Sequence, residues 1–306
     1  MTWLQGWDMN EGGIMPSGTN SKTALVLAGG GSLGAVQVGM LKALVANGVA
    51  ADFVVGSSVG AINGAYYAAA ATVENMARLE TLWRGITRND VFPVSWRSLL
   101  GFARRRDFLS GSHGIRDLVE RHLPYRNLED APIPVHVIAT DLLSGEAVVL
   151  SRGNAADAIA ASSAIPVAFA PVRIGGRFLI DGAVTSNTPV RVAVGLGAQR
   201  LIVLPTGFSC NLHAPPQGAV ANGLHALTLL IARQLVRELD TLPGDIDYAI
   251  VPSLCPLAGS AYDFTRTAAL IDDAERSTRS WIEAGGLSAR AVPDQLRAHS
   301  HHHDRE

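Results

Sequence analysis

The stretch LVLAGGGSLGAVQVGML, residues 25–41, decides the fold once its glycine-rich turn has been interpreted. The apolar segment at 23–28 predicts a strand, and 34–47 predicts a helix that packs through Val38, Leu41 and Leu44. The turn between them, from Gly29 to Gly34, has the GxGxxG spacing of dinucleotide-binding domains. Its unpaired backbone N–H groups suit a cofactor pyrophosphate, but they also suit an oxyanion that exists only in a transition state.

The second predicted strand, at 53–58, argues against a cofactor. In a dinucleotide-binding unit this strand ends in an Asp or Glu that binds the ribose. Here Asp52 precedes the strand and therefore lies at its wrong end. The strand ends instead in GSSVG, residues 56–60, a GxSxG nucleophile elbow between a strand and a helix. The pattern therefore predicts a nucleophile at Ser58, flanked by Gly56 and Gly60.

The glycine-rich turn then acquires the function of an oxyanion hole. The strands at 23–28 and 53–58 are predicted to be parallel neighbours, because the helix at 34–47 connects them. Their carboxyl ends then lie side by side, and N–H groups around Gly30, Gly31 and Ser32 point at a carbonyl oxygen attacked by Ser58. One such donor is typically worth about 2.7–4 kcal/mol in the transition state.

Two aspartates compete for the role of base. Asp141 ends a predicted strand at 135–141, and Asp181 ends the second strand of a predicted hairpin at 171–182. Either carboxylate needs a desolvated setting that raises its pKa, because a free aspartate is a weak base toward a hydroxyl.

A histidine base is the alternative. His213 and His225 follow the serine in the Ser–acid–His order of ordinary esterases, although neither lies at the carboxyl end of a predicted core strand. A Ser–Asp–His esterase that uses one of these two histidines therefore stays open.

Composition limits the other function classes. The 306 residues carry a net charge of −2, so no general field attracts nucleic acid and no nucleic-acid partner is expected. Hydrophobic residues make up 48%, which suits a parallel sheet covered on both faces. The sequence shows no secretory signal and no run of about 18 apolar residues. Together with only two cysteines, Cys210 and Cys255, expected to be buried thiols, this predicts a cytoplasmic protein, with peripheral membrane contact as an open possibility.

The chain is predicted to form one domain between two loose ends. Residues 1–21 are expected to be a flexible N-terminal segment and 289–306 a flexible His-rich tail, with a single domain at 22–288. Within it, 92–132 is a candidate lid or insertion, since aromatic residues and three arginines gather at 92–110. Further strands are predicted at 144–151, 200–205 and 248–251, and further helices at 59–71, 73–86, 114–123, 154–163, 217–241 and 262–284.

Three motifs together, GGGSLG (29–34), GSSVGAING (56–64) and DGA (181–183), resemble the patatin-like phospholipases. The resemblance extends over about 23–205 and is weak beyond it. It implies a three-layer α/β/α fold with a mostly parallel central sheet, and a Ser–Asp dyad without histidine that hydrolyses acyl esters of lipids. By the pattern of that family, Ser58 is the nucleophile, Asp181 and not Asp141 is the base, and Gly29, Gly30 and Gly31 form the oxyanion loop.

The resemblance also implies the substrate class. It predicts a serine lipid acyl hydrolase that acts on a phospholipid, lysophospholipid or other fatty acyl ester and requires no cofactor or metal. Leu33 stands where many members carry a basic residue, so the resemblance does not extend to a phosphate contact there or to a preference for a phospholipid head group. The segment ASSAIPVAFAPV (161–172) is a candidate lining of the acyl pocket. A non-catalytic lipid- or partner-binding relative that kept the fold is the competing hypothesis.

Overall fold

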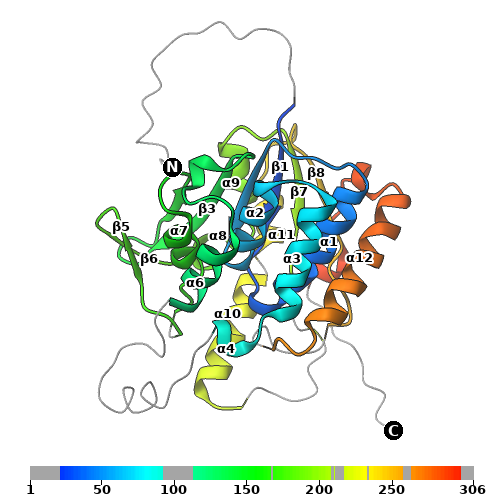
Figure 1. The fold of residues 1–306 in the computed structure, drawn as a ribbon. Coiled ribbons are helices and arrows are strands. Elements are labelled where there is room, and N and C mark those ends of the chain that lie inside the picture. The colour runs from blue at the N-terminus through cyan, green and yellow to red at the C-terminus, as the bar shows by residue number, and fades with distance from the viewer. Residues whose placement is uncertain are drawn as a thin grey trace, which may run out of the picture.

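The computed structural model describes residues 21–91, 113–166, 168–207, 210, 217–232, 234–257 and 263–297 (Figure 1). An eight-stranded sheet lies at its centre. Its strands are β1 (Thr23–Leu27), β2 (Phe53–Ser57), β3 (Val135–Asp141), β4 (Ala147–Leu150), β5 (Val172–Ile174), β6 (Arg177–Asp181), β7 (Arg200–Leu204) and β8 (Asp247–Ile250). All eight lie within segments predicted as strands or differ from them by one residue.

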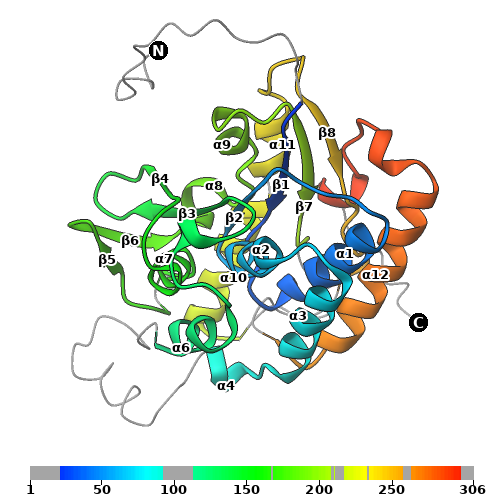
Figure 2. The same ribbon diagram turned by 45° about the horizontal axis from the view of Figure 1, so that its top comes forward.

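The sheet order is β5-β6-β3-β2-β1-β7-β8, with β4 paired to β3 off this path (Figure 2). Strands β3, β2, β1, β7 and β8 run parallel, whereas β4, β5 and β6 pair antiparallel with their neighbours. The register sets Leu27 opposite Gly56, so the carboxyl ends of β1 and β2 lie side by side. The predicted parallel pairing of these two strands is therefore confirmed.

Each face of the sheet has its own apolar core, which makes the fold three-layered. Alternate residues of β1 enter different cores: Leu25 packs on one face, and Ala24 and Val26 pack on the other. The first core is covered by α1 (Gly34–Ala46), α2 (Val59–Ala69), α3 (Val73–Gly85), α6 (His113–His122), α7 (Ala155–Ser162) and α12 (Thr267–Glu283). The second is covered by α9 (Val190–Gly195) and α11 (Gln234–Leu239). The predicted α/β/α fold with a mostly parallel sheet is confirmed.

The other helices are α4 (Arg88–Val91), α8 (Ala183–Ser186) and α10 (Ala219–Ala232). The helix predicted at 217–241 is described as α10 and α11, on either side of residue 233. The helix predicted to start at 262 starts at Thr267. Asp263 Oδ1 accepts hydrogen bonds from both the N–H and the hydroxyl of Thr265, and this local turn replaces a first helical turn.

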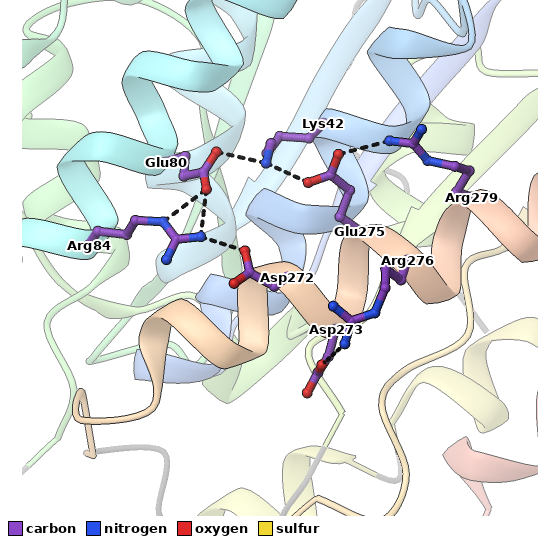
Figure 3. A network of polar contacts seen from close by, with 8 residues as sticks. All are labelled: Lys42, Glu80, Arg84, Asp272, Asp273, Glu275, Arg276 and Arg279. Atoms are coloured by element: carbon purple, nitrogen blue, oxygen red, sulfur yellow. Dashed lines mark hydrogen bonds and ion pairs between the residues drawn. The ribbon is translucent and has the colours of Figure 1, made fainter.

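A network of charged side chains joins α1, α3 and α12 (Figure 3). Lys42 of α1 lies 2.7 Å from a carboxylate oxygen of Glu80 on α3 and 2.5 Å from one of Glu275 on α12. Arg84 contacts both Glu80 and Asp272, so it joins α3 to α12 a second time. Because Lys42, Glu80 and Arg84 each take part in two ion pairs, the network can contribute more to the stability of the fold than isolated surface pairs do.

Expectations about the chain ends, a membrane-spanning helix and the cysteines have different outcomes in the structure. The aromatic and arginine segment at 92–110 lies outside the described residues. Of the expected flexible ends, 1–21 and 289–306, the structure describes only residue 21 and residues 289–297. Among the residues that are described, no helix is long and apolar enough to cross a membrane. Cys255 is exposed and Cys210 is half-buried, with their sulfurs 3.8 Å apart, so the expectation of two buried thiols is wrong.

Candidate active site

Ser58 lies in the tight turn between β2 and α2. Its φ is +52°, and it is the only non-glycine residue with a positive φ among the described parts of the chain. Such a backbone conformation is costly and is typical of functional turns. The flanking glycines are required by close packing, because a Cβ at Gly56 would lie 2.4 Å from the carbonyl oxygen of Gly60, and one at Gly60 2.4 Å from that of Leu27. The turn therefore has the shape that the GxSxG pattern predicts.

Asp181 reaches this turn from the end of β6. Its Oδ2 accepts a 2.7 Å hydrogen bond from the Ser58 hydroxyl, and its Oδ1 accepts a 2.8 Å bond from the N–H of Ala183. Both side chains are buried, with Asp181 only 3% exposed. Burial raises the pKa of Asp181 from 3.8 to about 6, although the two hydrogen bonds oppose the rise. The structure thus holds a carboxylate of increased basicity against the hydroxyl of Ser58.

Asp141, the competing aspartate, has other partners. Its Oδ1 accepts hydrogen bonds from the N–H groups of Leu143 at 2.9 Å and Ser144 at 3.4 Å, and its Oδ2 lies 3.9 Å from Arg177. These contacts stabilise the turn between β3 and β4. Its side chain therefore has a structural function.

The two candidate histidines have different positions. His213 lies outside the described residues, and His225 is half-buried in α10. In the part of the chain that the structure describes, no histidine ring forms a hydrogen bond with Ser58 or Asp181. Likewise, no cluster of three or more His, Cys, Asp or Glu residues that could hold a metal ion occurs among the described residues.

The glycine loop lies beside Ser58, but its residues are not equivalent. The N–H of Gly29 donates a 3.0 Å bond to the carbonyl of Asn187, so this amide is not available to an oxyanion, contrary to the expectation for Gly29. The carbonyl of Gly29 accepts a 2.7 Å bond from Thr206, which holds the loop from the other side. Among the described residues, the amides of Gly30 and Gly31 donate to no acceptor. Gly31 has a φ of +59°, which favours glycine at this position.

The next residue of the loop, Ser32, is 1% exposed and lies in the middle of the short 3₁₀ turn, Gly31–Leu33, that leads into α1. Leu33 follows it and lies in the wall of the hollow next to Ser58. The apolar side chain of Leu33 therefore occupies the position where a basic residue is common in the family that the sequence resembles.

A second serine, Ser162, lies in the segment 161–172 that the sequence suggested as a lining of the acyl pocket, but it supports the turn instead. The N–H of Ser58 donates a 2.8 Å hydrogen bond to Ser162 Oγ, and the Ser162 hydroxyl donates to the carbonyl of Ile138. The carbonyl of Ser162 also accepts a bond from the N–H of Gly182, next to Asp181. One residue at the end of α7 thus holds the chain on both sides of the Ser58–Asp181 contact.

A buried polar network of Gln37, Asn63 and Trp83 supports the glycine loop. Gln37 Nε2 donates to the carbonyls of Ala28, at 2.8 Å, and Leu204, at 2.9 Å. Asn63 Nδ2 donates to Gln37 Oε1 at 2.9 Å and to the carbonyl of Gly34 at 3.0 Å. Asn63 Oδ1 in turn accepts the indole N–H of Trp83 at 2.8 Å. Because the carbonyls of Ala28 and Gly34 bracket the loop, this network fixes both of its ends.

The comparisons with known proteins agree with the motifs. A family model described as patatin-like phospholipase matches residues 25–194, which is more than half of the chain. An uncharacterized NTE family protein from Mycobacterium tuberculosis is 32% identical over 191 residues, covering 61% of this chain and 49% of that protein. Patatin-like phospholipase domain-containing protein 7 from Mus musculus is 28% identical over 191 residues, covering 62% of this chain and 14% of that protein.

This chain thus spans about half the length of the mycobacterial relative and a smaller part of the mouse protein. Among solved structures, that of VipD from Legionella pneumophila covers 87% of this chain and 67% of its own, with 14% identity and a TM-score of 0.45. The region that the family model matches, residues 25–194, contains the glycine loop, the turn at Ser58 and the strand that ends at Asp181. The chain belongs to the patatin-like phospholipase family.

Proposed function

We propose that this protein is a serine lipid acyl hydrolase, an esterase of the phospholipase A or lysophospholipase type. Ser58 is its nucleophile, Asp181 its base, and the amides of Gly30 and Gly31 form its oxyanion hole. The observation that carries the proposal is the 2.7 Å hydrogen bond from the Ser58 hydroxyl to a buried carboxylate. Membership of the patatin-like phospholipase family supports a lipid substrate.

The proposed reaction is an acyl transfer in two steps. Ser58 Oγ attacks the ester carbonyl while its proton moves to Asp181 Oδ2, and the amides of Gly30 and Gly31 stabilise the negative oxygen. Asp181 then passes the proton to the leaving alcohol, and an acyl-serine remains. Water attacks this acyl-serine with Asp181 again as the base, which releases the fatty acid and restores Ser58.

The raised pKa of Asp181 supports this role. A carboxylate with a pKa of about 6 is a stronger base than an ordinary aspartate, and it remains mostly deprotonated at pH 7. Its partners, the Ser58 hydroxyl and the Ala183 N–H, are uncharged. Among the described residues, burial raises the pKa of Asp181 without an ion pair that would lower it.

We further propose that residues 22–288 form one hydrolase domain, because a single sheet includes strands from Thr23 to Ile250. The lid function at 92–132 remains a proposal supported by sequence; of this segment the structure describes α6 and the residues that follow it up to β3. Peripheral contact with a membrane is proposed as the way in which the enzyme reaches a lipid substrate.

The test combines ester hydrolysis with active-site labelling. Ser58→Ala and Asp181→Asn are each expected to abolish hydrolysis of p-nitrophenyl esters and phospholipids, while His225→Ala and Asp141→Asn retain activity. A fluorophosphonate probe is expected to label Ser58 in the wild-type protein. Folded protein that is not labelled would instead indicate a non-catalytic lipid- or partner-binding relative, and loss of activity in His225→Ala or in a His213→Ala variant would indicate a Ser–Asp–His esterase.

A further inference from the structure

Two hollows meet at Ser58, and their walls differ in chemistry. The first has a volume of about 620 Å³ and is lined in part by Asp181, Asn187 and Thr206. The second has a volume of about 530 Å³ and extends among α2, α3, α6 and the end of α7. Gly31, Ser58 and Ile165 belong to the walls of both. A substrate attacked by Ser58 therefore has a separate space on each side of its reacting carbonyl.

The wall of the second hollow is almost entirely apolar. Its principal side chains are Ile62, Trp83, Ile86, Leu118, Phe169 and Phe264. The one polar group of these, the indole N–H of Trp83, is bonded to Asn63 Oδ1, so the ring contributes only carbon to the wall. Trp83 and Phe264 stack with their centroids 6.5 Å apart, which gives this wall a continuous aromatic surface.

The hollow is partly open to solvent, so either water or a ligand covers its apolar wall. Apolar surface gains free energy when an apolar group replaces the water against it. Water is a poor occupant, since the wall offers few polar partners. The hollow is therefore suited to an apolar ligand, and its opening at Ser58 means that this ligand is joined to the carbonyl under attack.

We infer that the second hollow holds the fatty acyl chain of the substrate, and that the first holds its alcohol part. This inference rests on the proposed function and specifies the orientation of the substrate within that site. The first hollow suits a polar alcohol part because Asn187 Oδ1 is buried there without a hydrogen-bond partner among the described residues. The residues of the second hollow then determine which acyl chain lengths are accepted.

The test is the dependence of kcat/KM on acyl length, measured with p-nitrophenyl esters from acetate to palmitate. Each methylene that enters the hollow is expected to raise kcat/KM up to about fourfold, until the hollow is full. Leu118→Trp reduces the space, and it is expected to lower kcat/KM for long-chain esters by at least about tenfold while the acetate value changes by less than about twofold. Phe264→Leu enlarges the space and is expected to move the optimum to longer chains.

The control is Leu230→Trp, which makes the same substitution at a 69% exposed position on α10. It is expected to keep the wild-type profile. If Leu118→Trp does not fold, as judged by circular dichroism, Phe264→Leu provides the result. Hydrolysis of acetate with a flat length profile, or a profile that neither cavity variant changes, overturns the acyl-site inference alone. No hydrolysis of any ester, together with no fluorophosphonate labelling, overturns the proposed function, and the acyl site falls with it.

Discussion

Asp181→Asn is expected to stabilise the protein while it abolishes activity. In the folded state burial raises the pKa of Asp181 from 3.8 to about 6, so the folded protein binds this proton more tightly than the unfolded chain does. The buried carboxylate therefore opposes folding above about pH 3.8, and the penalty reaches its full size above about pH 6. The rise of the pKa from 3.8 to about 6 lowers the free energy of unfolding by about 3 kcal/mol at pH 8. Asparagine has nearly the same shape and carries no charge, so it removes this penalty.

The sign of the pH dependence follows from the same linkage. As the pH falls toward 3.8, Asp181 becomes protonated in the folded state first, and the penalty decreases. The difference in stability between Asp181→Asn and the wild type is expected to shrink from about 3 kcal/mol at pH 8 to roughly half of that at pH 5. A gain in stability on loss of a functional group is the usual trade-off at a site selected for activity.

The assay is urea unfolding of both proteins at pH 8 and pH 5, with ester hydrolysis measured on the same samples. Asp141→Asn makes the same chemical change in the turn between β3 and β4, where hydrogen bonds to Leu143 and Ser144 are weakened, and is expected to bring no gain in stability. The reasoning is refuted if Asp181→Asn is less stable than the wild type at pH 8, or if their difference does not shrink at pH 5.

Three further predictions follow from named contacts. First, kcat/KM for a neutral ester is expected to fall about tenfold per pH unit below about pH 6, because Asp181 must be deprotonated to act as the base; a profile that stays flat down to pH 4.5 would contradict this. Second, Asn63→Ala is expected to lower the free energy of unfolding in urea by about 2–4 kcal/mol and also to lower kcat, because it leaves the buried partners of Asn63 next to the glycine loop unpaired. If kcat is unchanged in folded protein, the network does not position the loop. Third, Lys42→Met is expected to cost about 1 kcal/mol, since Glu80 and Glu275 lose a shared cation, and the loss should decrease in 1 M salt; a loss that salt does not change would point to packing instead.

Local sequence determined the two turns that meet at the candidate site. At 23–47, and again at 53–69, a short apolar strand, a turn that contains glycine and a helix follow one another directly in the chain. The helix between β1 and β2 connects them as parallel strands, and this makes the two strands neighbours in the sheet. The sequence also predicted the strand of Asp181 and all the other strands, because apolar runs bounded by turn residues carry that information locally.

Helix boundaries were less well predicted. The start at Thr267 depends on a side-chain turn at Asp263, which competes with helix formation and leaves no clear periodic signal. The expectation for Gly29 failed for a related reason. Whether its N–H is available depends on Asn187, more than 150 residues away in the chain, and no local pattern reports such a contact.

By itself, the sequence determined the motifs and left two aspartates as candidates, with the family resemblance favouring one of them. Only the tertiary structure decided which carboxylate contacts Ser58: the pairing of β3 with β6 sets Asp181 opposite Ala139 and brings it to the turn, whereas the side chain of Asp141 bonds within its own turn. The tertiary structure also decided the support from Ser162, and the burial that raises the pKa of Asp181. Burial and long-range hydrogen bonds depend on which distant elements pack together, whereas strands, turns and motifs are encoded by neighbours in the chain.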